Sequence, residues 1–354
     1  MRPAQLQESL RARAKQGTDG RIPPLYIWGP PGIGKSRIVA EVAREMGIGF
    51  VDVRLLLCDP SDLKGIPFPD VQNRTALWLP PSNLPVTMNG KRPDIPEKGI
   101  LFFDDMPTAP PLLQAAAYQI TTPPYAIGDA KLLPGWAVLA AGNRREDRSL
   151  THRVPPALAS RFTHVELEPN QTDWTNWAIK HDISPTIISF LNNFGEDAGG
   201  ISMLFNFNPE KEERAFPTPR GWEGVDGILN AGYSESVEYI EIEGTVGQAA
   251  GAKFSAFRRL FNKLPDPMDI LVRKRYTVTP KSIDSLFAFI GMVSGKADKS
   301  QQHLDAIFGW AQTLPEEAGV LLGKLTYGKY RENCALSPAF VKWSTAHADL
   351  LVDL

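Results

Sequence analysis

The chain has 354 residues, which is long enough for two domains or one large one, and its 43% apolar and 22% charged residues are typical of a soluble globular protein. A formal net charge of −2 gives no electrostatic reason to expect binding to nucleic acid or to an acidic membrane. The only cysteines, Cys58 and Cys334, are far apart, and there is neither a run of about 18 apolar residues nor an apolar signal segment at the start, so we expect a cytoplasmic protein without a disulfide framework.

Residues 1–21 predict a short, basic helix that leads into the first domain. Leu6 and Leu10 share one face of this helix among Gln, Glu and Arg residues. The polar, glycine-bearing stretch 16–20 is expected to end the helix.

A phosphate-binding loop comes next. Leu25–Trp28 predicts a strand and Ile38–Ala43 predicts a helix, and between them lies the pattern G-x-x-x-x-G-K-[ST]. Its glycines let the backbone turn so that N–H groups point at phosphate oxygens. Lys35 is expected to reach the β- and γ-phosphates, and the Ser36 hydroxyl to bind Mg²⁺. The candidate nucleotide-binding residues are Gly29, Pro30, Pro31, Gly32, Ile33, Gly34, Lys35, Ser36 and Arg37. The alternative is a glycine-rich turn that binds nothing.

A proline-rich insertion, from about residue 58 to 98, follows the second predicted strand at Phe50–Leu55. We expect its prolines to interrupt any regular element. Apolar residues argue against disorder and predict an ordered insertion. These residues are Trp78, Leu79, Leu84 and Val86.

The run Gly99–Asp105 is an unbroken apolar stretch that stops at two acidic residues, which is typical of a buried parallel strand. In parallel α/β sheets the ligand crevice lies at the carboxyl ends of the strands, so both acids are expected near the phosphate loop. Asp104 is predicted to hold Mg²⁺, and Asp105 to orient or deprotonate the attacking water. The alternative is that the two acids only cap the next helix.

A helix carrying Leu112 to Ile120 is expected next, and then a hairpin at about 123–135 with Gly128-Asp129 at its turn. Trp136–Ala141 predicts another buried strand, after which comes Asn143. An amide in this position can contact the γ-phosphate and the lytic water, whereas by itself an Asn after a strand is more often a turn residue.

Arginine is frequent between residues 144 and 161, and Arg161 differs from the others because it directly precedes a strand at 163–167. After that strand the pattern becomes helical. Helices are expected at 173–179, 185–193, 220–230, 254–262, 283–293, 304–311 and from Ser337-Pro338 onward. The aromatic residues of this half are predicted to form its core.

Together these stretches resemble the AAA+ ATPases, and within them the MoxR-like branch with an insert in helix 2. The resemblance covers about residues 22–235, in which Gly29–Ser36 resembles Walker A and Leu101–Asp105 Walker B. It identifies Asn143 with sensor 1 and Arg161 with the arginine finger that reaches the neighbouring subunit's γ-phosphate. Thr218-Pro219-Arg220 is similar to sensor 2 at the start of a lid helix. The insertion and the hairpin correspond to the helix-2 insert and the pre-sensor-1 insertion.

The resemblance implies a nucleotide-binding core at 22–168, after the lead-in at 1–21, and a helical lid with a helical extension at 169–354. It implies ATP and Mg²⁺ as ligands. The catalytic residues would be Lys35, Asp105, Asn143, Arg161 and Arg220, and the Mg²⁺ ligands Ser36 and Asp104. An arginine supplied in trans requires an oligomeric ring, which in such folds is commonly a hexamer. The implied activity is ATP-driven remodelling of a protein client, often a von Willebrand factor A-domain protein in relatives.

One departure from the family leaves two further functions open. The family usually ends Walker B with Asp-Glu, whereas this chain has Asp104-Asp105, whose second carboxylate is one methylene shorter. A nucleotide-gated assembly scaffold with slow hydrolysis is therefore an alternative. A nucleic-acid motor is another, for which Lys91, Arg92 and Lys131 are the candidate contacts and against which the net charge argues. Arg153 competes with Arg161 as the trans arginine.

Overall fold

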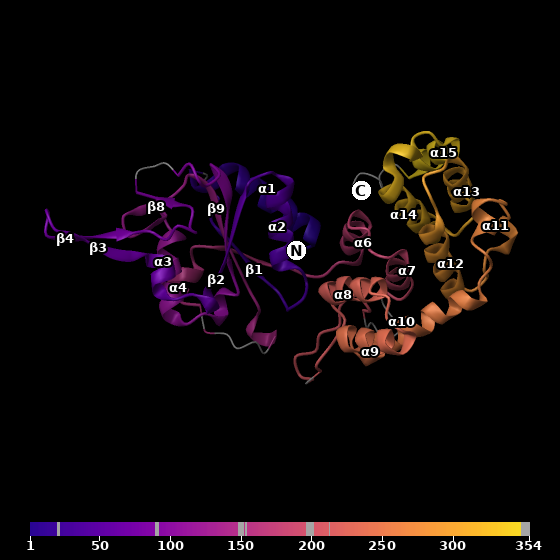
Figure 1. Cartoon of the computed structure of the whole chain (residues 1–354), viewed down its shortest axis with the longest axis horizontal. Helices are drawn as coiled ribbons and strands as arrows, with labels where there is room; N and C mark the ends of the chain where they lie inside the picture. Colours follow the sequence, from indigo (N-terminus) through magenta and orange to yellow (C-terminus); the bar gives the residue numbers. More distant parts are fainter. Residues whose placement is uncertain are drawn as a thin grey trace. The chain divides into compact units, whose positions relative to one another are not determined.

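The protein is described here from a computed structural model covering residues 1–19, 22–88, 92–147, 152, 154–195, 202–211 and 213–347 (Figure 1). The chain divides into two compact units. The first comprises Met1–Glu168 with Asn208–Glu210, and the second Pro169–Phe207 with Lys211–Leu354. The first is an α/β unit and the second is helical, so the expected fold class is confirmed. No helix in the described ranges is long and apolar enough to cross a membrane.

The first unit is built on a parallel sheet of five strands in the order β10-β1-β9-β6-β2. β9 therefore separates β1 from β6, and the carboxyl ends of these three neighbours lie at one edge of the sheet. The strands are β1 Leu25–Trp28, β2 Gly49–Arg54, β6 Lys98–Asp104, β9 Gly135–Gly142 and β10 Thr163–Glu166. The sequence predicted all five, with ends within one or two residues.

Helices cover both faces of this sheet (Figure 1). Residues 101 and 103 of β6 pack with α4 in one buried cluster. Because strand side chains alternate, residues 100 and 102 face the opposite side, where α1 and α2 contact β6. The helices and 3₁₀ turns of the unit are α1 Pro3–Gln16, η1 Gly17–Asp19, α2 Lys35–Glu45, η2 Leu55–Leu57, α3 Pro60–Lys64, η3 Met106–Thr108, α4 Pro111–Ile120, η4 Arg145–Asp147 and α5 Pro156–Ala159.

The lead-in helix α1 is an integral part of the α/β unit. Leu6 and Leu10 are completely buried, and α1 packs on α2 and β9. Arg11 forms an ion pair with Glu45 at the end of α2, with 2.6 Å between Nη2 and Oε2. The chain start is also fixed, because the Met1 amino group donates to the backbone oxygen of Glu166 at 2.6 Å.

The proline-rich insertion contains regular structure, so the expectation that its prolines interrupt every element is wrong. It forms α3, the antiparallel pair β3 Ile66–Asp70 and β4 Thr75–Leu79, and the short strand β5 Val86–Thr87. Pro67 and Pro69 lie inside β3, opposite Trp78 and Ala76. A strand tolerates proline where its N–H would not serve the ladder, and the two prolines sit at alternate positions. Proline at the first turn of α3 is tolerated for the same reason.

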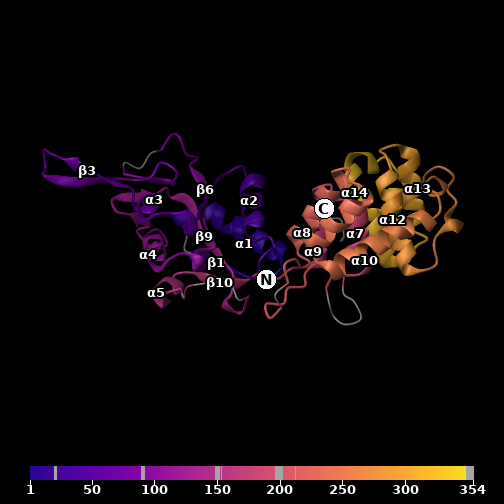
Figure 2. The ribbon, with the colours of Figure 1, turned by 60° about the horizontal axis from the view of Figure 1, so that its bottom comes forward.

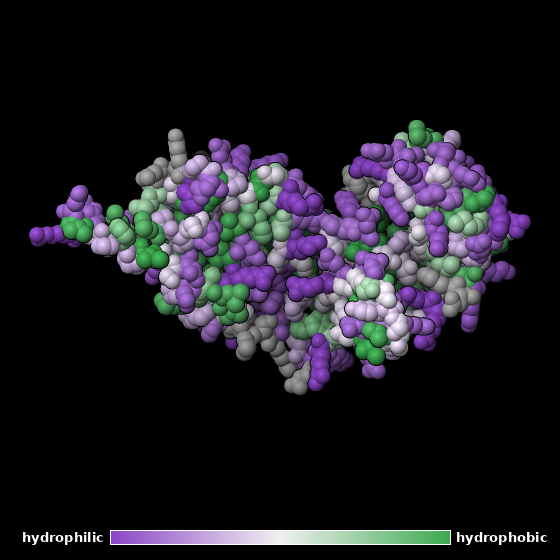
Figure 3. All heavy atoms as spheres, in the orientation of Figure 1, coloured by the Kyte–Doolittle hydropathy of each residue, from purple (hydrophilic) through white to green (hydrophobic). Residues whose placement is uncertain are grey.

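We call β3, β4 and the turn between them the insertion hairpin. It projects from the first unit in two views (Figures 1 and 2). Apolar side chains gather along it (Figure 3). Those that are exposed are Ile66, Phe68, Val71, Leu77, Trp78 and Leu79. In contrast, Leu84 and Val86 beyond the hairpin are fully buried.

The second hairpin is found where the sequence predicted it. It consists of β7 Ala126–Ile127 and β8 Ala130–Leu132, with residues 128–129 at the turn. β8 also pairs with β5, so the hairpin and the end of the insertion form one three-stranded sheet. The two inserted segments therefore support each other structurally.

The second unit is helical and has its own aromatic core, as expected. Fully buried Trp222 and Phe254 meet edge to face, as do Phe289 and Trp310. Ser337 caps the last helix by accepting from the Phe340 N–H at 3.1 Å. The elements are α6 Gln171–Lys180, α7 Pro185–Asn193, α8 Pro219–Asn230, α9 Glu235–Val246, α10 Gln248–Arg259, η5 Leu260–Lys263, α11 Met268–Leu271, η6 Tyr276–Val278, α12 Ile283–Lys296, α13 Gln301–Ala311, α14 Glu316–Cys334 and α15 Pro338–Ala346.

Burial of α1 predicts that Leu10→Ala lowers the free energy of unfolding of the first unit by about 2–5 kcal/mol, because it removes apolar contacts and leaves a cavity. Urea denaturation at constant temperature measures this change. Glu8→Ala, on an exposed position of the same helix, is the control and should change stability by less than about 0.5 kcal/mol. Equal effects of the two variants would contradict a structural role for α1.

Candidate functional site

The predicted phosphate loop connects β1 to α2 and has the backbone that such a loop requires. Gly32 and Gly34 adopt left-handed conformations, with φ of 79° and 95°. These φ values are readily accessible to glycine alone, since a Cβ would strain the backbone there. Ile33 between them is buried. The two glycines thus set the direction of the loop's N–H groups, and the buried side chain of Ile33 anchors the loop.

Lys35 is the most constrained charge of the loop. Its side chain is 7% exposed, and its Nζ donates to the backbone oxygens of Gly29 and Pro30 at 2.7 and 3.0 Å. A third hydrogen bond, of 2.7 Å, runs to Oδ1 of Asn143. An ammonium group has three donors, so these acceptors match its capacity. The loop lysine and the polar residue after β9 are therefore in direct contact.

The second contact across the site joins Ser36 to Asp104. The Ser36 hydroxyl donates to Oδ2 of Asp104 at 2.6 Å, and Asp104 is buried at the end of β6. Tight packing beside β9 supports this arrangement, because a Cβ at Gly142 would lie 2.3 Å from the ring of Pro107. The strand order explains both contacts, since β1 and β6 lie on either side of β9.

Asp105 has an unusual backbone for a residue with a side chain. It lies in the left-handed region, with φ 49° and ψ 35°, and its side chain is exposed. Its N–H donates to Oδ1 of Asp104 at 3.0 Å. Asp and Asn adopt this conformation more readily than longer side chains do. The conformation gives a physical reason for an aspartate, and not a longer acidic side chain, at position 105.

Asp52 and Arg54 lie near the carboxyl end of β2, at the same edge of the sheet as Asp104. The sequence did not point to either residue as part of the site. Arg54 pairs in register with Asp104, and its Nε lies 3.5 Å from Oδ2 of Asp52. Burial, followed by the charge of Asp104, raises the pKa of Asp52 above its ordinary value. Their alternation within β2 was visible in the sequence, but the register against β6 was not.

Three stacked aromatic rings lie on β1 and β10, the two strands beside the start of the loop. Tyr26 and Trp28 stack with ring centroids 4.2 Å apart, and His164 stacks on both rings. The Tyr26 hydroxyl is buried with no hydrogen-bond partner among the described residues. Burial, together with the charge of Asp105, raises the pKa of Tyr26. These ring contacts join β1, the strand that precedes the loop, to β10.

The predicted arginines occupy different surroundings. Arg161, just after α5, is exposed, and its Nη2 donates to the Tyr118 hydroxyl at 2.6 Å. Arg37 is exposed on α2, and Arg220 is an exposed residue of α8 in the second unit. Arg153 lies outside the described residues. The structure therefore brings Lys35 into contact with Asn143, and Ser36 into contact with Asp104. The functional roles of Arg161 and Arg220 stay predictions.

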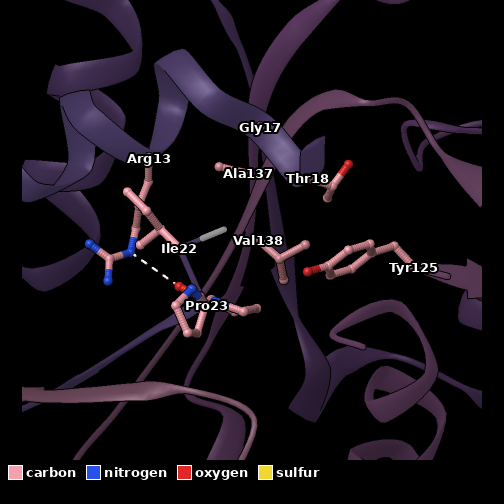
Figure 4. A pocket seen from close by; sticks show the side chains of 9 residues that line it. Arg13, Gly17, Thr18, Ile22, Pro23, Tyr125, Ala137 and Val138 are labelled. Atoms are coloured by element: carbon pink, nitrogen blue, oxygen red, sulfur yellow. Dashed lines mark hydrogen bonds between the residues drawn. The ribbon is translucent and has the colours of Figure 1, made fainter. Parts of the chain in front are cut away.

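A small pocket lies near the amino ends of β1 and β9, at the other edge of the sheet from the phosphate loop (Figure 4). Arg13 lies beside it and donates through Nε to the backbone oxygen of Pro23 at 3.3 Å. Burial lowers the pKa of Arg13. The pocket has room for roughly one water molecule, so it does not hold a nucleotide.

No protein-family model and no curated protein sequence matches the chain. Solved structures similar to it include RuvB from Thermotoga maritima, with 14% identity, 76% of this chain and 74% of that chain covered, and a TM-score of 0.37. A katanin structure has 15% identity, coverage of 71% and 81%, and a TM-score of 0.34. NtrX from Brucella abortus, solved in complex with ADP, has 14% identity, coverage of 98% and 67%, and a TM-score of 0.33. Likeness at this level leaves the function to be inferred from the residues of the chain itself.

The raised pKa of Asp52 predicts a pH-dependent stability. The folded state holds this proton more tightly than the unfolded state, so stability decreases as the pH rises above the ordinary value of 3.8. Asp52→Asn should therefore melt at a higher temperature than the unsubstituted protein at neutral pH, and the difference should narrow as the pH approaches about 4.

Thermal unfolding followed by circular dichroism, without added divalent cations, measures this difference. Asp94→Asn is the control, because Arg92 lowers the pKa of Asp94 to about 2 and the substitution should bring no gain. A lower melting temperature for Asp52→Asn at neutral pH would contradict the prediction.

Proposed function

We propose that the protein is an AAA+ ATPase that binds Mg²⁺-ATP at the loop Gly29–Ser36 and hydrolyses its β–γ phosphoanhydride bond. One observation carries the proposal: the loop contacts residues at the carboxyl ends of β9 and β6, through Lys35 to Asn143 and through Ser36 to Asp104. A glycine-rich turn without function would not need a buried lysine and a buried aspartate aimed at the same loop.

The residues present fit a magnesium ion. Ser36 and Asp104 supply a hydroxyl and a carboxylate oxygen 2.6 Å apart, and both are hard ligands of the kind that Mg²⁺ prefers. Within the described ranges no three His, Cys, Asp or Glu side chains form a metal-binding group. The ion would thus take its other ligands from phosphate and water, which is how Mg²⁺ is commonly held. It would neutralise charge on the β- and γ-phosphates.

Asp105 is the proposed base that orients or deprotonates the attacking water. Its carboxylate is exposed at the carboxyl end of β6, next to the proposed magnesium ligand Asp104. Asn143 would orient the same water or the γ-phosphate after Lys35 exchanges this amide for a phosphate oxygen. Lys35 already holds three acceptors, so one of them must be released when phosphate enters.

Arg161 is proposed to complete the site of a neighbouring subunit, so the working form would be a ring, commonly a hexamer. An arginine finger stabilises charge on the transferred phosphoryl group and accounts for about 10³–10⁵ in turnover in enzymes that use one. Arg220 at the start of α8 is proposed to sense the γ-phosphate from the helical unit.

The MoxR-like branch is the finer proposal. It is supported by the positions of the insertion hairpin, between β2 and β6, and of the β7–β8 hairpin directly before β9. The activity proposed for this branch is remodelling or activation of a protein client, with a von Willebrand factor A-domain protein as the client class that the resemblance implies. The cytoplasm is the proposed compartment.

A nucleotide-gated scaffold with slow hydrolysis is the second candidate, and the left-handed, shortened Asp105 is the observation that favours it. The nucleic-acid motor loses one of its candidate contacts. Arg92 is engaged within the insertion, by Asp94 at 2.7 Å and by the backbone oxygens of Val86 and Ser82. Lys131 remains exposed on β8, and Lys91 lies outside the described residues.

Substitution of the loop lysine and the magnesium ligand should abolish ATP hydrolysis. We expect Lys35→Ala and Asp104→Ala to remove turnover, and Arg161→Ala to lower kcat by about 10³-fold or more. Phosphate release under saturating Mg²⁺-ATP measures all three. Arg44→Ala, at an exposed arginine of α2, and Arg145→Ala, at an exposed arginine of η4, are the controls and should leave turnover unchanged. Full activity of Lys35→Ala would refute the proposed site.

The role of Asp105 is separable from its backbone conformation. Asp105→Asn keeps a residue that accepts the left-handed region but removes the carboxylate, so kcat should fall by about 10²–10⁴-fold with little change in melting temperature. Asp105→Glu restores the family's carboxylate at a cost of about 1 kcal/mol in backbone strain. No gain in turnover for Asp105→Glu would support a tuned enzyme, whereas a large gain would support the scaffold.

A further inference from the structure

Arg161 differs from three arginines of the first unit in the kind of partner that holds its side chain. Arg11, Arg92 and Arg144 each form an ion pair with a carboxylate, at 2.6, 2.7 and 3.1 Å. No carboxylate among the described residues forms an ion pair with Arg161. Its partner is the neutral side chain of Tyr118, so the positive charge of Arg161 stays uncompensated within the described part of the subunit.

Tyr118 contacts the guanidinium in two ways. Its hydroxyl accepts from Nη2 at 2.6 Å, and its ring lies beneath the group, with 5.2 Å from the guanidinium carbon to the ring centroid. Together, a hydrogen bond in one direction and a ring face in another fix both the position and the tilt of a planar cation. An arginine side chain has five donors, and within the described part of the chain one of them has an acceptor. The remaining donors are available to an anion from outside.

Tyr118 itself is held on a rigid element. It lies on α4, is half-buried, and packs against the core cluster that contains Leu113 and Ala117 of the same helix. α4 begins six residues after Asp105 in the sequence, so the residue that holds the guanidinium is carried by the helix that follows the proposed base.

His164 of β10 holds the backbone just before Arg161. Trp28 Nε1 donates to His164 Nδ1 at 2.8 Å, and His164 Nε2 lies 2.8 Å from the backbone oxygen of Ala159. An indole nitrogen only donates, so Nδ1 must accept and Nε2 must carry the proton that bonds to Ala159. The last residue of α5, Ala159, is thereby linked through His164 to Trp28 of β1, while Tyr118 contacts the guanidinium group of Arg161.

We propose that Tyr118 is a positioning residue for Arg161, which orients the guanidinium toward the γ-phosphate of ATP bound by the adjacent subunit. The inference rests on the proposed function, in which Arg161 acts in trans. A neutral partner suits this role, because a carboxylate would compete with the phosphate for the same donors, whereas a phenol orients the cation and leaves its charge available.

A mixed-subunit experiment tests the proposal. Lys35→Ala chains lack a working loop but supply an intact arginine, and Arg161→Ala chains have the reverse composition. Co-expression with two different tags and tandem purification yields mixed oligomers, whose ATP hydrolysis should exceed that of either parent. Tyr118→Phe, which keeps the ring and removes the hydroxyl, is then introduced into one kind of chain at a time.

We expect the position of Tyr118→Phe to decide the outcome. In the arginine-supplying Lys35→Ala chains it should lower kcat of the mixture roughly 10- to 100-fold with KM for ATP little changed. In the Arg161→Ala chains it should have no effect, because their Tyr118 has no guanidinium to orient. Tyr125→Phe in the supplying chains is the control and should also have no effect, since Tyr125 lies beside the separate small pocket.

Two results would overturn the proposal in distinguishable ways. If the plain mixture is active and Tyr118→Phe in the supplying chains does not reduce its turnover, or reduces it equally from either chain, Tyr118 has no positioning role. If the plain mixture is no more active than its parents while the unsubstituted protein hydrolyses ATP, Arg161 does not act in trans, and the role of Tyr118 falls with it. An inactive unsubstituted protein would instead refute the proposed ATPase.

Discussion

The buried ammonium group of Lys35 is the charge around which the first unit is arranged. A charge at 7% exposure is costly unless hydrogen bonds compensate it, and the three acceptors come from the loop itself and from the residue after β9. The conformation of the loop therefore depends on the pairing of β1 with β9, in which their last residues, Trp28 and Gly142, are in register. The sheet order, the loop and the lysine depend on one another.

Negative side chains lie close to the loop, and a positive one lies further away. Close to the loop, carboxylates accumulate at the ends of β6 and β2. Burial, and after it repulsion from the charge of Asp104, raises the pKa of Asp52. A divalent cation would relieve that repulsion, which is a reason for a subunit to be more stable with Mg²⁺ than without it. Further away lies Arg161, whose charge of the opposite sign has no ion-pair partner among the described residues. In the proposed function, ATP binding and subunit assembly would each neutralise one of these charges.

Much of the fold was predictable from the sequence, because β1, β6 and β9 are largely continuous apolar runs and the loop has a fixed spacing. The parallel strands also predicted that Asp104 would lie at the same edge of the sheet as the phosphate loop, whereas the contacts Lys35–Asn143 and Ser36–Asp104 were not predicted. The contact of Arg161 with Tyr118 was not predictable, since it joins α4 to a segment that follows α5 across 43 positions. The register that sets Arg54 beside Asp104 was likewise hidden. The prolines of β3 led to a wrong prediction, because the sequence alone does not show which edge of a strand forms no hydrogen bonds to a neighbouring strand.

Those prolines bear on how the protein stays dispersed. An exposed apolar hairpin is a hazard, because its free edges can template the addition of strands from other chains. The ladder bonds donated by β3 to β4 must come from Ile66, Phe68 and Asp70, so the donors along its outer edge would have been those of Pro67 and Pro69. Neither has an N–H. Along β3 the hairpin therefore offers apolar side chains for contact while lacking the main-chain donors with which edge-to-edge aggregation begins.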